Sequence, residues 1–215
     1  MRMEAMPPAR SGTPASGGTR RVALWLWFGL WCTVSSLLGA WMVAQHELAL
    51  PAPQGVRQKL EPAQEGVRGP ALFARHYLAV DCGCSKGLAK TLVERGPRAA
   101  PWREEVVLIG RAQQLAAQLS AAGYSVRSVE NEEALKEDGV EGAPWLLLYS
   151  ASGDLAYSGG YAKGRPGTTG TVLEDLSLMS AVERGEHPGA LPAYGCATSR
   201  ELRRRLDPFG LKYTP

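Results

Sequence analysis

The sequence lacks a marked charge of either sign. Its 24 Lys and Arg residues nearly balance 21 Asp and Glu residues, which gives a formal net charge of +3 over 215 residues. This balance offers no electrostatic argument for nucleic-acid binding. Arg200, Arg203, Arg204 and Arg205 do cluster, but on an expected C-terminal helix with leucines facing inward such a cluster is typical of a solvated face. We therefore expect no nucleic-acid partner.

Several common catalytic and metal-binding patterns are also missing. The sequence has no P-loop, no Gly-rich dinucleotide loop and no Ser-His-Asp set in a suitable context. It has only three histidines, and neither a His cluster nor a second cysteine pair favours zinc. A lone strand histidine such as His76 is more often packed than catalytic, although it could tune a nearby thiol. The remaining reactive residues are Cys32, Cys82, Cys84 and Cys196.

One long hydrophobic run is present, at residues 22–44. It contains no charged side chain and four of the six tryptophans. At about 1.5 Å per residue, a helix of this length covers the roughly 30 Å hydrocarbon core of a bilayer. A cleavable signal peptide is the alternative, but its apolar core is usually about 7–15 residues long. We interpret the run as a transmembrane helix, with bounds 22–46.

Positive charges flank this run asymmetrically. Arg20 and Arg21 directly precede it, whereas the first Lys or Arg after it is Arg57. The positive-inside rule then keeps the N-terminus in the cytoplasm. We expect a single-pass protein of a bacterial inner membrane whose C-terminal domain faces the periplasm, where disulfide chemistry is allowed.

The rest of the chain divides by composition. Residues 1–21, rich in Pro, Ser, Gly and Thr, predict a disordered cytoplasmic tail. Residues 47–70 mix Pro, Gly and charge, which predicts a linker without a packed element. Residues 71–215 are then long enough for one domain with a real core and a C-terminal helical extension.

Strand and helix patterns alternate from residue 71. Apolar and β-branched runs predict strands at 72–80, 104–110, 124–130, 145–150 and 155–159, the last two as an antiparallel hairpin. Helical spacing predicts helices at 84–95, 111–123, 131–139 and about 169–184. This order predicts an α/β fold in which helices flank a central mixed sheet.

Cys82 and Cys84 lie in the segment DCGCS, where the first strand ends and a helix begins. First-turn N–H groups and the helix dipole stabilise a thiolate there, which lowers the thiol pKa from about 8.5. The Asp81 carboxylate opposes this unless it turns away as the helix N-cap. The sequence therefore predicts a redox-active centre. Cys32, within the hydrophobic run, is expected to be a small apolar residue.

Three arrangements of the other cysteines stay open. A Cys82–Cys84 disulfide, with Gly83 allowing the small ring, would be strained and readily reduced. Alternatively, Cys82 or Cys84 pairs permanently with Cys196 as a structural bridge. In the third arrangement the three thiolates bind Cu(I) or another soft metal.

Taken in order, these features resemble the thioredoxin-like superfamily, and most closely the membrane-anchored TlpA-type and RedB-like thiol-disulfide proteins of bacteria. The resemblance covers about residues 71–185. It rests on the cysteine pair, on a Gly-x-Pro strand, turn and returning strand at 139–161, and on the additional strand-helix-strand of 104–130. The cysteine spacing is one residue shorter than the family's usual Cys-x-x-Cys, and Asp81 stands where Trp is usual.

The resemblance implies a thiol-disulfide oxidoreductase that acts on protein thiols and disulfides without an organic cofactor. It implies that Cys82 is the more exposed nucleophile, that Cys84 resolves the mixed disulfide, and that a cis bond between Ala143 and Pro144 positions the partner. Cys196 is either a resolving thiol or a structural partner. A membrane electron donor is a further expected partner, and the direction of electron flow stays open. The alternatives are a copper or other soft-metal delivery module that uses Cys82, Cys84 and Cys196, and a redox-inactive thioredoxin-like scaffold.

Overall fold

The computed structural model describes residues 17–47, 49–53, 55–60, 71–129, 136, 138–164, 172–208, 210 and 213. The chain divides into two compact units, Met1–His46 and Glu47–Pro215. Most of the expected tail and most of the helix predicted at 131–139 lie outside the described residues.

Helix α1 (Gly17–Glu47) makes up the described part of the first unit. It begins earlier than predicted, because residues 17–21 of the expected tail are already helical. Its segment Arg21–Trp41 contains a stretch of 18 residues with a mean hydropathy of 1.6, and it is long and apolar enough to cross a membrane. A signal sequence near the N-terminus would meet the same criteria of length and composition.

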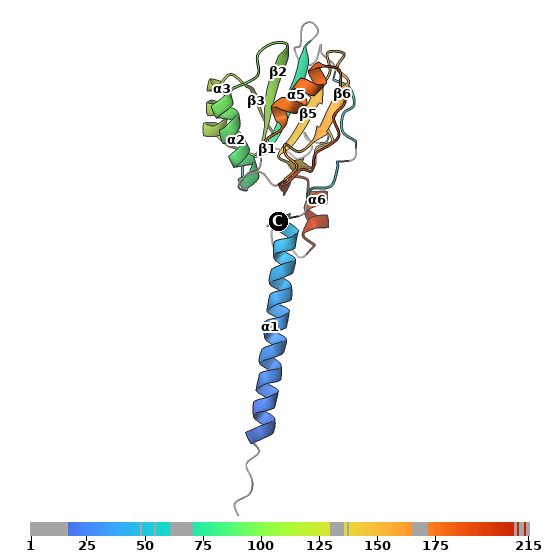
Figure 1. The fold of residues 1–215 in the computed structure, drawn as a ribbon. Coiled ribbons are helices and arrows are strands. Elements are labelled where there is room, and N and C mark those ends of the chain that lie inside the picture. The colour runs from blue at the N-terminus through green and yellow to red at the C-terminus, as the bar shows by residue number, and fades with distance from the viewer. Residues whose placement is uncertain are drawn as a thin grey trace, which may run out of the picture. The chain divides into compact units, whose positions relative to one another are not determined.

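The second unit is built on a five-stranded mixed sheet with the order β3-β2-β1-β5-β6 (Figure 1). Strands β1 (Leu72–Ala79), β2 (Trp102–Ile109) and β3 (Ser125–Val129) are parallel to one another. Strands β5 (Trp145–Tyr149) and β6 (Leu155–Gly159) continue the sheet in antiparallel fashion. The α/β fold and the closing hairpin predicted from the sequence are confirmed.

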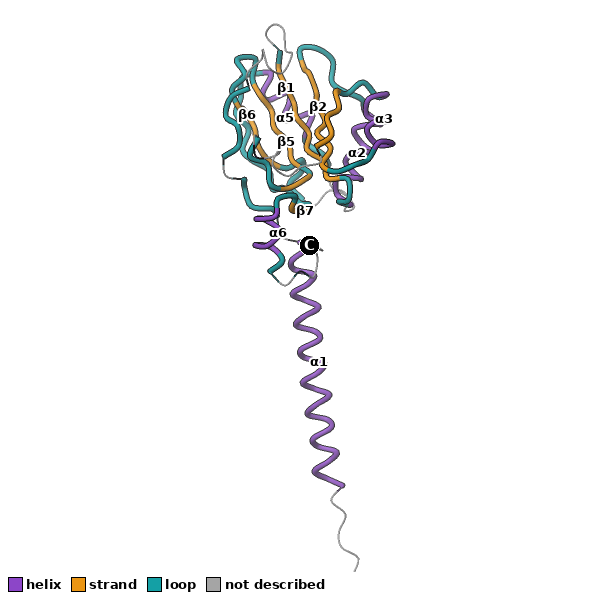
Figure 2. The backbone as a smooth tube through the Cα atoms, turned by 180° about the vertical axis from the view of Figure 1, so that it is seen from behind, coloured by secondary structure: helices purple, strands orange, loops and turns teal. Residues whose placement is uncertain are grey.

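Three helices pack on one face of this sheet. They are α2 (Gly83–Arg95), α3 (Gln113–Ala121) and α5 (Asp175–Glu183), and their leucines join inward-facing residues of β1, β2 and β5 in one core cluster. Seen from behind, the strands lie in front of α5 (Figure 2). Helix α5 starts later than the predicted residue 169, since the described residues 172–174 are not helical.

The opposite face is covered mainly by irregular chain and by the short helix α6 (Arg200–Leu206). Leu50, Val56 and Leu60 are buried on this face, and their segment bridges to Ala193 and Asp154 through Leu50 and Lys59. The linker predicted at 47–70 therefore needs correction over 49–60. In this segment, irregularly spaced leucine and valine side chains cover the sheet face. They follow neither the helix nor the strand period, so the sequence gives no sign of the packing.

A second, two-stranded sheet was not predicted. Strand β4 (Gly142–Ala143) pairs antiparallel with β7 (Cys196–Ala197), so that Ala143 is the partner of Cys196. The approach is close, because a Cβ atom on Gly195 would collide with the Ala143 carbonyl oxygen. Strands of two residues carry no alternation pattern, which is why sequence reasoning missed them.

Charged groups are buried on both sides of the sheet. On the helical side, Glu104 accepts hydrogen bonds from Arg95 at 2.8 Å and 3.2 Å and lies 2.8 Å from Nε2 of His76. On the other side, Asp138 accepts from Arg75 at 3.1 Å and from the Tyr77 hydroxyl at 2.5 Å. These pairings offset the cost of removing the charges from water.

Candidate functional site

Cys82 occupies the junction of β1 and α2. It is the N-cap residue of α2, with extended backbone angles (φ −91°, ψ 123°) and no side-chain capping bond. Asp81 is therefore not the helix N-cap but an exposed residue just before it. The buried Ser85 hydroxyl accepts a hydrogen bond from the Ala79 backbone N–H at 3.1 Å, which ties the helix start to the strand end. The Cys82 sulfur thus lies at the positive end of the α2 dipole.

The three cysteines of the second unit come together at this point. Cys196 on β7 and Cys84 in the first turn of α2 both hydrogen-bond to the Cys82 sulfur, and none of the three is in a disulfide. The thiol of Cys196, then that of Cys84, and further the backbone N–H groups of Ser85 and Cys84 hold the pKa of Cys82 well below its ordinary value, although burial opposes this. The predicted thiolate environment is present, and Cys196 contributes most to it.

Exposure of the cysteines differs from the expectation. Cys82 has only 2% of its surface exposed, whereas Cys84 and Cys196 are half-buried. The prediction that Cys82 is the more exposed nucleophile is therefore wrong. Strand β7 and the Ala143 carbonyl cover its sulfur, which is the physical reason for its burial.

The Ala143-Pro144 peptide bond is cis, as predicted, and lies next to Cys82. As a thiol, Cys82 donates to the Ala143 carbonyl oxygen at 3.7 Å. A second cis bond, Ala100-Pro101, was not predicted. The backbone edge of β4 beside Cys82 is already paired with β7.

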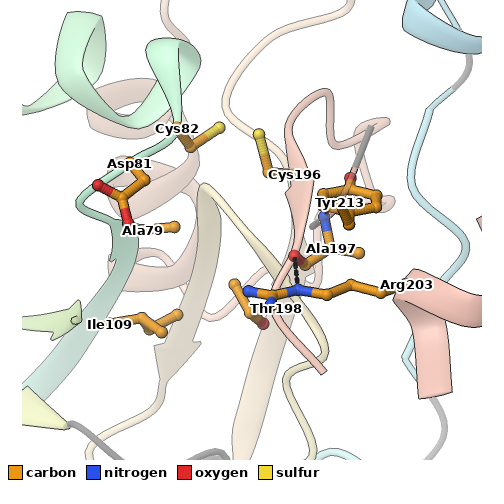
Figure 3. A pocket seen from close by; sticks show the side chains of 9 residues that line it. All are labelled: Ala79, Asp81, Cys82, Ile109, Cys196, Ala197, Thr198, Arg203 and Tyr213. Atoms are coloured by element: carbon orange, nitrogen blue, oxygen red, sulfur yellow. Dashed lines mark hydrogen bonds between the residues drawn. The ribbon is translucent and has the colours of Figure 1, made fainter. Parts of the chain in front are cut away.

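A cavity of about 350 Å³ opens beside the two facing sulfur atoms of Cys82 and Cys196 (Figure 3). Its apolar walls come from Ala79, Ile109 and Ala197. The remaining lining residues are polar or aromatic: Asp81, Thr198, Arg203 and Tyr213. Cys84 is not among the lining residues. Of the three cysteines in this unit, the cavity is therefore lined by Cys82 and Cys196.

Two lining residues were not recognised from the sequence as parts of a site. Arg203 was assigned to a solvated face, yet it is half-buried, its Nε donates to the Ala197 carbonyl at 3.1 Å, and its guanidinium lies over Tyr213. Thr198 is 6% exposed, and among the described residues its hydroxyl has no hydrogen-bond partner. No local pattern marks either residue, because α6 is placed by packing of Leu202 rather than by proximity in sequence.

His76 is packed away from the thiols. Its Nδ1 lies 2.9 Å from the Tyr161 hydroxyl and its Nε2 lies 2.8 Å from Glu104, so both ring nitrogens are engaged in the helical-side core. Within the part of the chain that the structure describes, no group of three or more His, Cys, Asp and Glu side chains has an arrangement that could hold a metal ion.

Comparisons with known proteins support the fold. A comparison with protein-family models found no match, and neither did a comparison with curated proteins. Among solved structures, an uncharacterized conserved protein from Geobacillus kaustophilus has a TM-score of 0.54 at 16% identity, covering 71% of this chain and 94% of that one. A hypothetical protein from Sinorhizobium meliloti 1021 has a TM-score of 0.51 at 17% identity, covering 70% and 94%. A putative thiol:disulfide interchange protein DsbE from Chlorobium tepidum matches at a TM-score of only 0.34, with 17% identity and coverage of 52% and 79%.

The second unit has the thioredoxin-like fold. The mixed sheet order, the helix that follows β1 and has Cys82 as its N-cap, and the cis proline that precedes β5 together define this class. It is preceded in the chain by the apolar helix α1.

Proposed function

We propose that this protein is a thiol-disulfide oxidoreductase in which Cys82 is the reacting sulfur. The observation that carries the proposal is the position of Cys82 at the N-cap of α2, where its sulfur faces that of Cys196 on β7 (Figure 3). A thiolate is the attacking species in disulfide exchange, and a lowered pKa keeps it populated at neutral pH. No organic cofactor is needed, since a pair of thiols carries two electrons.

The exchange runs in two steps. The Cys82 thiolate attacks one sulfur of a partner disulfide, forms a mixed disulfide and releases the partner's other sulfur as a thiolate. A second thiolate, from Cys84 or Cys196, then attacks the Cys82 sulfur and releases the remaining partner thiol. Ala143 and Pro144 position the partner, in keeping with the Ala143 carbonyl being 3.7 Å from Cys82 Sγ. The same two steps in reverse order transfer a disulfide from this protein to a partner dithiol.

The protein would work tethered to a membrane. Helix α1 would anchor it in the bacterial inner membrane with the N-terminus in the cytoplasm and the thioredoxin-like domain in the periplasm. Its expected partners are protein thiols or disulfides and a membrane electron donor. A protein partner would have to exchange with the half-buried Cys84 or Cys196, or reach Cys82 after β7 moves away.

The test is a redox titration of the full-length protein in detergent micelles. The protein is equilibrated in glutathione buffers, and alkylation with peptide mass spectrometry reports the state of Cys82, Cys84 and Cys196. We expect a bridge to Cys82 that forms and breaks reversibly in the range of roughly −120 to −270 mV of known exchange proteins. A bridge that resists reduction below about −300 mV, or the absence of any bridge, would contradict the proposed function.

A further inference from the structure

The cavity beside Cys82 limits what can reach this sulfur. Cys82 is 2% exposed, the edge of β4 next to it is paired with β7, and the cavity is lined by both Cys82 and Cys196. Its volume of about 350 Å³ lies at the lower end of the roughly 300–1,000 Å³ typical of small-molecule pockets. A small disulfide therefore fits the observed arrangement, whereas a folded protein would first have to displace β7.

The polar lining of the cavity carries groups that recognise charge. The Arg203 guanidinium uses Nε for the Ala197 carbonyl, and to the described residues it makes no other hydrogen bond. Its remaining N–H groups match the geometry of a carboxylate, which guanidinium binds in bidentate fashion. Thr198, buried beside it with a hydroxyl that has no partner within the described chain, supplies a further polar contact. A buried hydroxyl without a partner is costly, and a ligand oxygen would satisfy it.

Asp81 adds a group of the opposite charge. It lines the same cavity from the turn between β1 and α2, while Arg203 reaches the cavity from α6 on the other side (Figure 3). One carboxylate and one guanidinium at the two sides of a small cavity match the ammonium and the carboxylate of an α-amino acid. The sulfur atoms of Cys82 and Cys196, which also line the cavity, supply the reacting group.

We propose that the cavity binds the disulfides of small amino-acid thiols, with Arg203 and Thr198 holding the ligand carboxylate and Asp81 its ammonium group. This proposal rests on the proposed function and names the substrate class of the same site. The Cys82 thiolate attacks the ligand disulfide R–S–S–R, giving Cys82–S–S–R and one RS⁻, which takes up a proton. The Cys196 thiolate then attacks the Cys82 sulfur and releases the second RS⁻. In total the ligand disulfide is reduced to two thiols, and Cys82 and Cys196 are oxidised to one disulfide.

The test compares four symmetrical disulfides that differ in their charged groups. They are cystine, 3,3′-dithiodipropionate with carboxylates only, cystamine with ammonium groups only, and 2-hydroxyethyl disulfide with neither. The full-length protein in detergent micelles is reduced, freed of reductant and mixed with each disulfide, and acid-quenched samples are analysed by peptide mass spectrometry. Each oxidation rate is divided by that of dithiothreitol with the same disulfide, which removes differences in intrinsic reactivity.

We expect cystine to react fastest, and we expect Arg203→Gln to slow cystine and dithiodipropionate by about tenfold, the effect of losing a charge-assisted hydrogen bond. The same variant should leave cystamine and hydroxyethyl disulfide unchanged. Arg204→Gln, an exposed neighbour on α6 that does not line the cavity, is the matched control and should change none of the rates. Arg203→Lys keeps the positive charge and should retain part of the preference for disulfides that carry carboxylates.

The inference can be overturned in two distinguishable ways. If all four disulfides oxidise Cys82 at equal relative rates, and Arg203→Gln behaves like Arg204→Gln, the substrate class is wrong while the exchange function survives. The same conclusion follows if only a protein disulfide reacts. If neither the small disulfides nor a protein disulfide oxidises Cys82, the proposed function fails as well.

Discussion

Cys196 is the antiparallel partner of Ala143, the residue whose carbonyl oxygen is 3.7 Å from the Cys82 sulfur. This pairing places a cysteine of the C-terminal extension directly against the strand-to-helix cysteine. The edge of β4 beside the Cys82 sulfur is therefore paired within the chain itself. The C-terminal extension is thus part of the thiol centre, and it determines which sulfur faces Cys82.

The pairing of β7 with β4 should depend on Gly195. A Cβ atom at this position would collide with the Ala143 carbonyl oxygen and the Pro144 ring, so Gly195→Ala must push β7 outward. We expect the equilibrium constant for the Cys82–Cys196 disulfide in glutathione buffer to fall at least about fivefold, as overpacking of this kind costs about 1–3 kcal/mol. Alkylation and peptide mass spectrometry measure it.

Gly189→Ala is the matched control for this variant. Gly189 lies in the same connecting segment, and a Cβ atom there meets nothing within 4 Å. The disulfide equilibrium should then stay within about 0.5 kcal/mol of the parent protein. Equal equilibria for the two variants would show that close packing at Gly195 does not hold Cys196 in place.

Cys82 should react as a thiolate at unusually low pH. The hydrogen bond from Cys196 is the main cause of its lowered pKa, so its alkylation rate, relative to its own plateau at high pH, should stay high as pH falls below about 8.5. Cys196→Ala removes this hydrogen bond and should move the midpoint of the profile upward, toward that of the unfolded chain. A midpoint that stays near 8.5 in the parent protein would contradict the lowered pKa.

The sequence predicted the elements that carry local signals. The buried runs of β1 and β2, the hairpin of β5 and β6, and the cysteines at a strand-to-helix junction all depend on neighbouring residues. The contact of Cys196 with Cys82, by contrast, depends on tertiary packing between distant segments. The same holds for Arg203. Its place in a basic cluster predicts a solvated face, but tertiary packing places α6 so that Arg203 lines the cavity.

The packing of residues 49–60 shows that composition, too, does not predict tertiary contacts. Pro, Gly and charge in this segment favour a linker, but three well-spaced apolar side chains are enough to cover a sheet face. Backbone hydrogen bonds from Leu50 to Ala193 at 2.7 Å and from Leu60 to Gly153 at 2.8 Å complete the contact. Average polarity therefore did not indicate whether the segment packs.

Glu104 should stabilise the domain in a pH-dependent way. Burial alone raises its pKa, but hydrogen bonds from His76 and Arg95 outweigh burial and lower the pKa to about 2. Because the folded pKa lies below the unfolded value near 4.5, this stabilisation is complete above pH 4.5 and is lost as pH falls toward 2. Urea denaturation of the 47–215 fragment at several pH values measures the effect.

Glu104→Gln should remove both the pH dependence and the ion pair between residue 104 and Arg95. Arg95 keeps its ion pair with Asp175 at 3.0 Å, so the loss at neutral pH should be at most the roughly 3–5 kcal/mol of a fully broken buried pair. Glu94→Gln is the control, since Glu94 is exposed and only 3.8 Å from an exposed Lys90, a pair worth at most about 0.5 kcal/mol. Similar losses for the two variants at neutral pH would mean that the Glu104 pairing adds little to stability.

The segment at 49–60 should contribute directly to the stability of the thioredoxin-like unit. Leu50, Val56 and Leu60 are each at most 8% exposed, and burying one such side chain is worth about 1.5–3 kcal/mol. A fragment of residues 71–215 should therefore unfold at clearly lower urea concentration than the 47–215 fragment. Within the longer fragment, Leu60→Ala should cost about 2–5 kcal/mol, whereas Lys59→Ala, at an exposed neighbour, should cost no more than about 0.5 kcal/mol. If both fragments unfold at the same urea concentration, the contacts of this segment do not stabilise the domain.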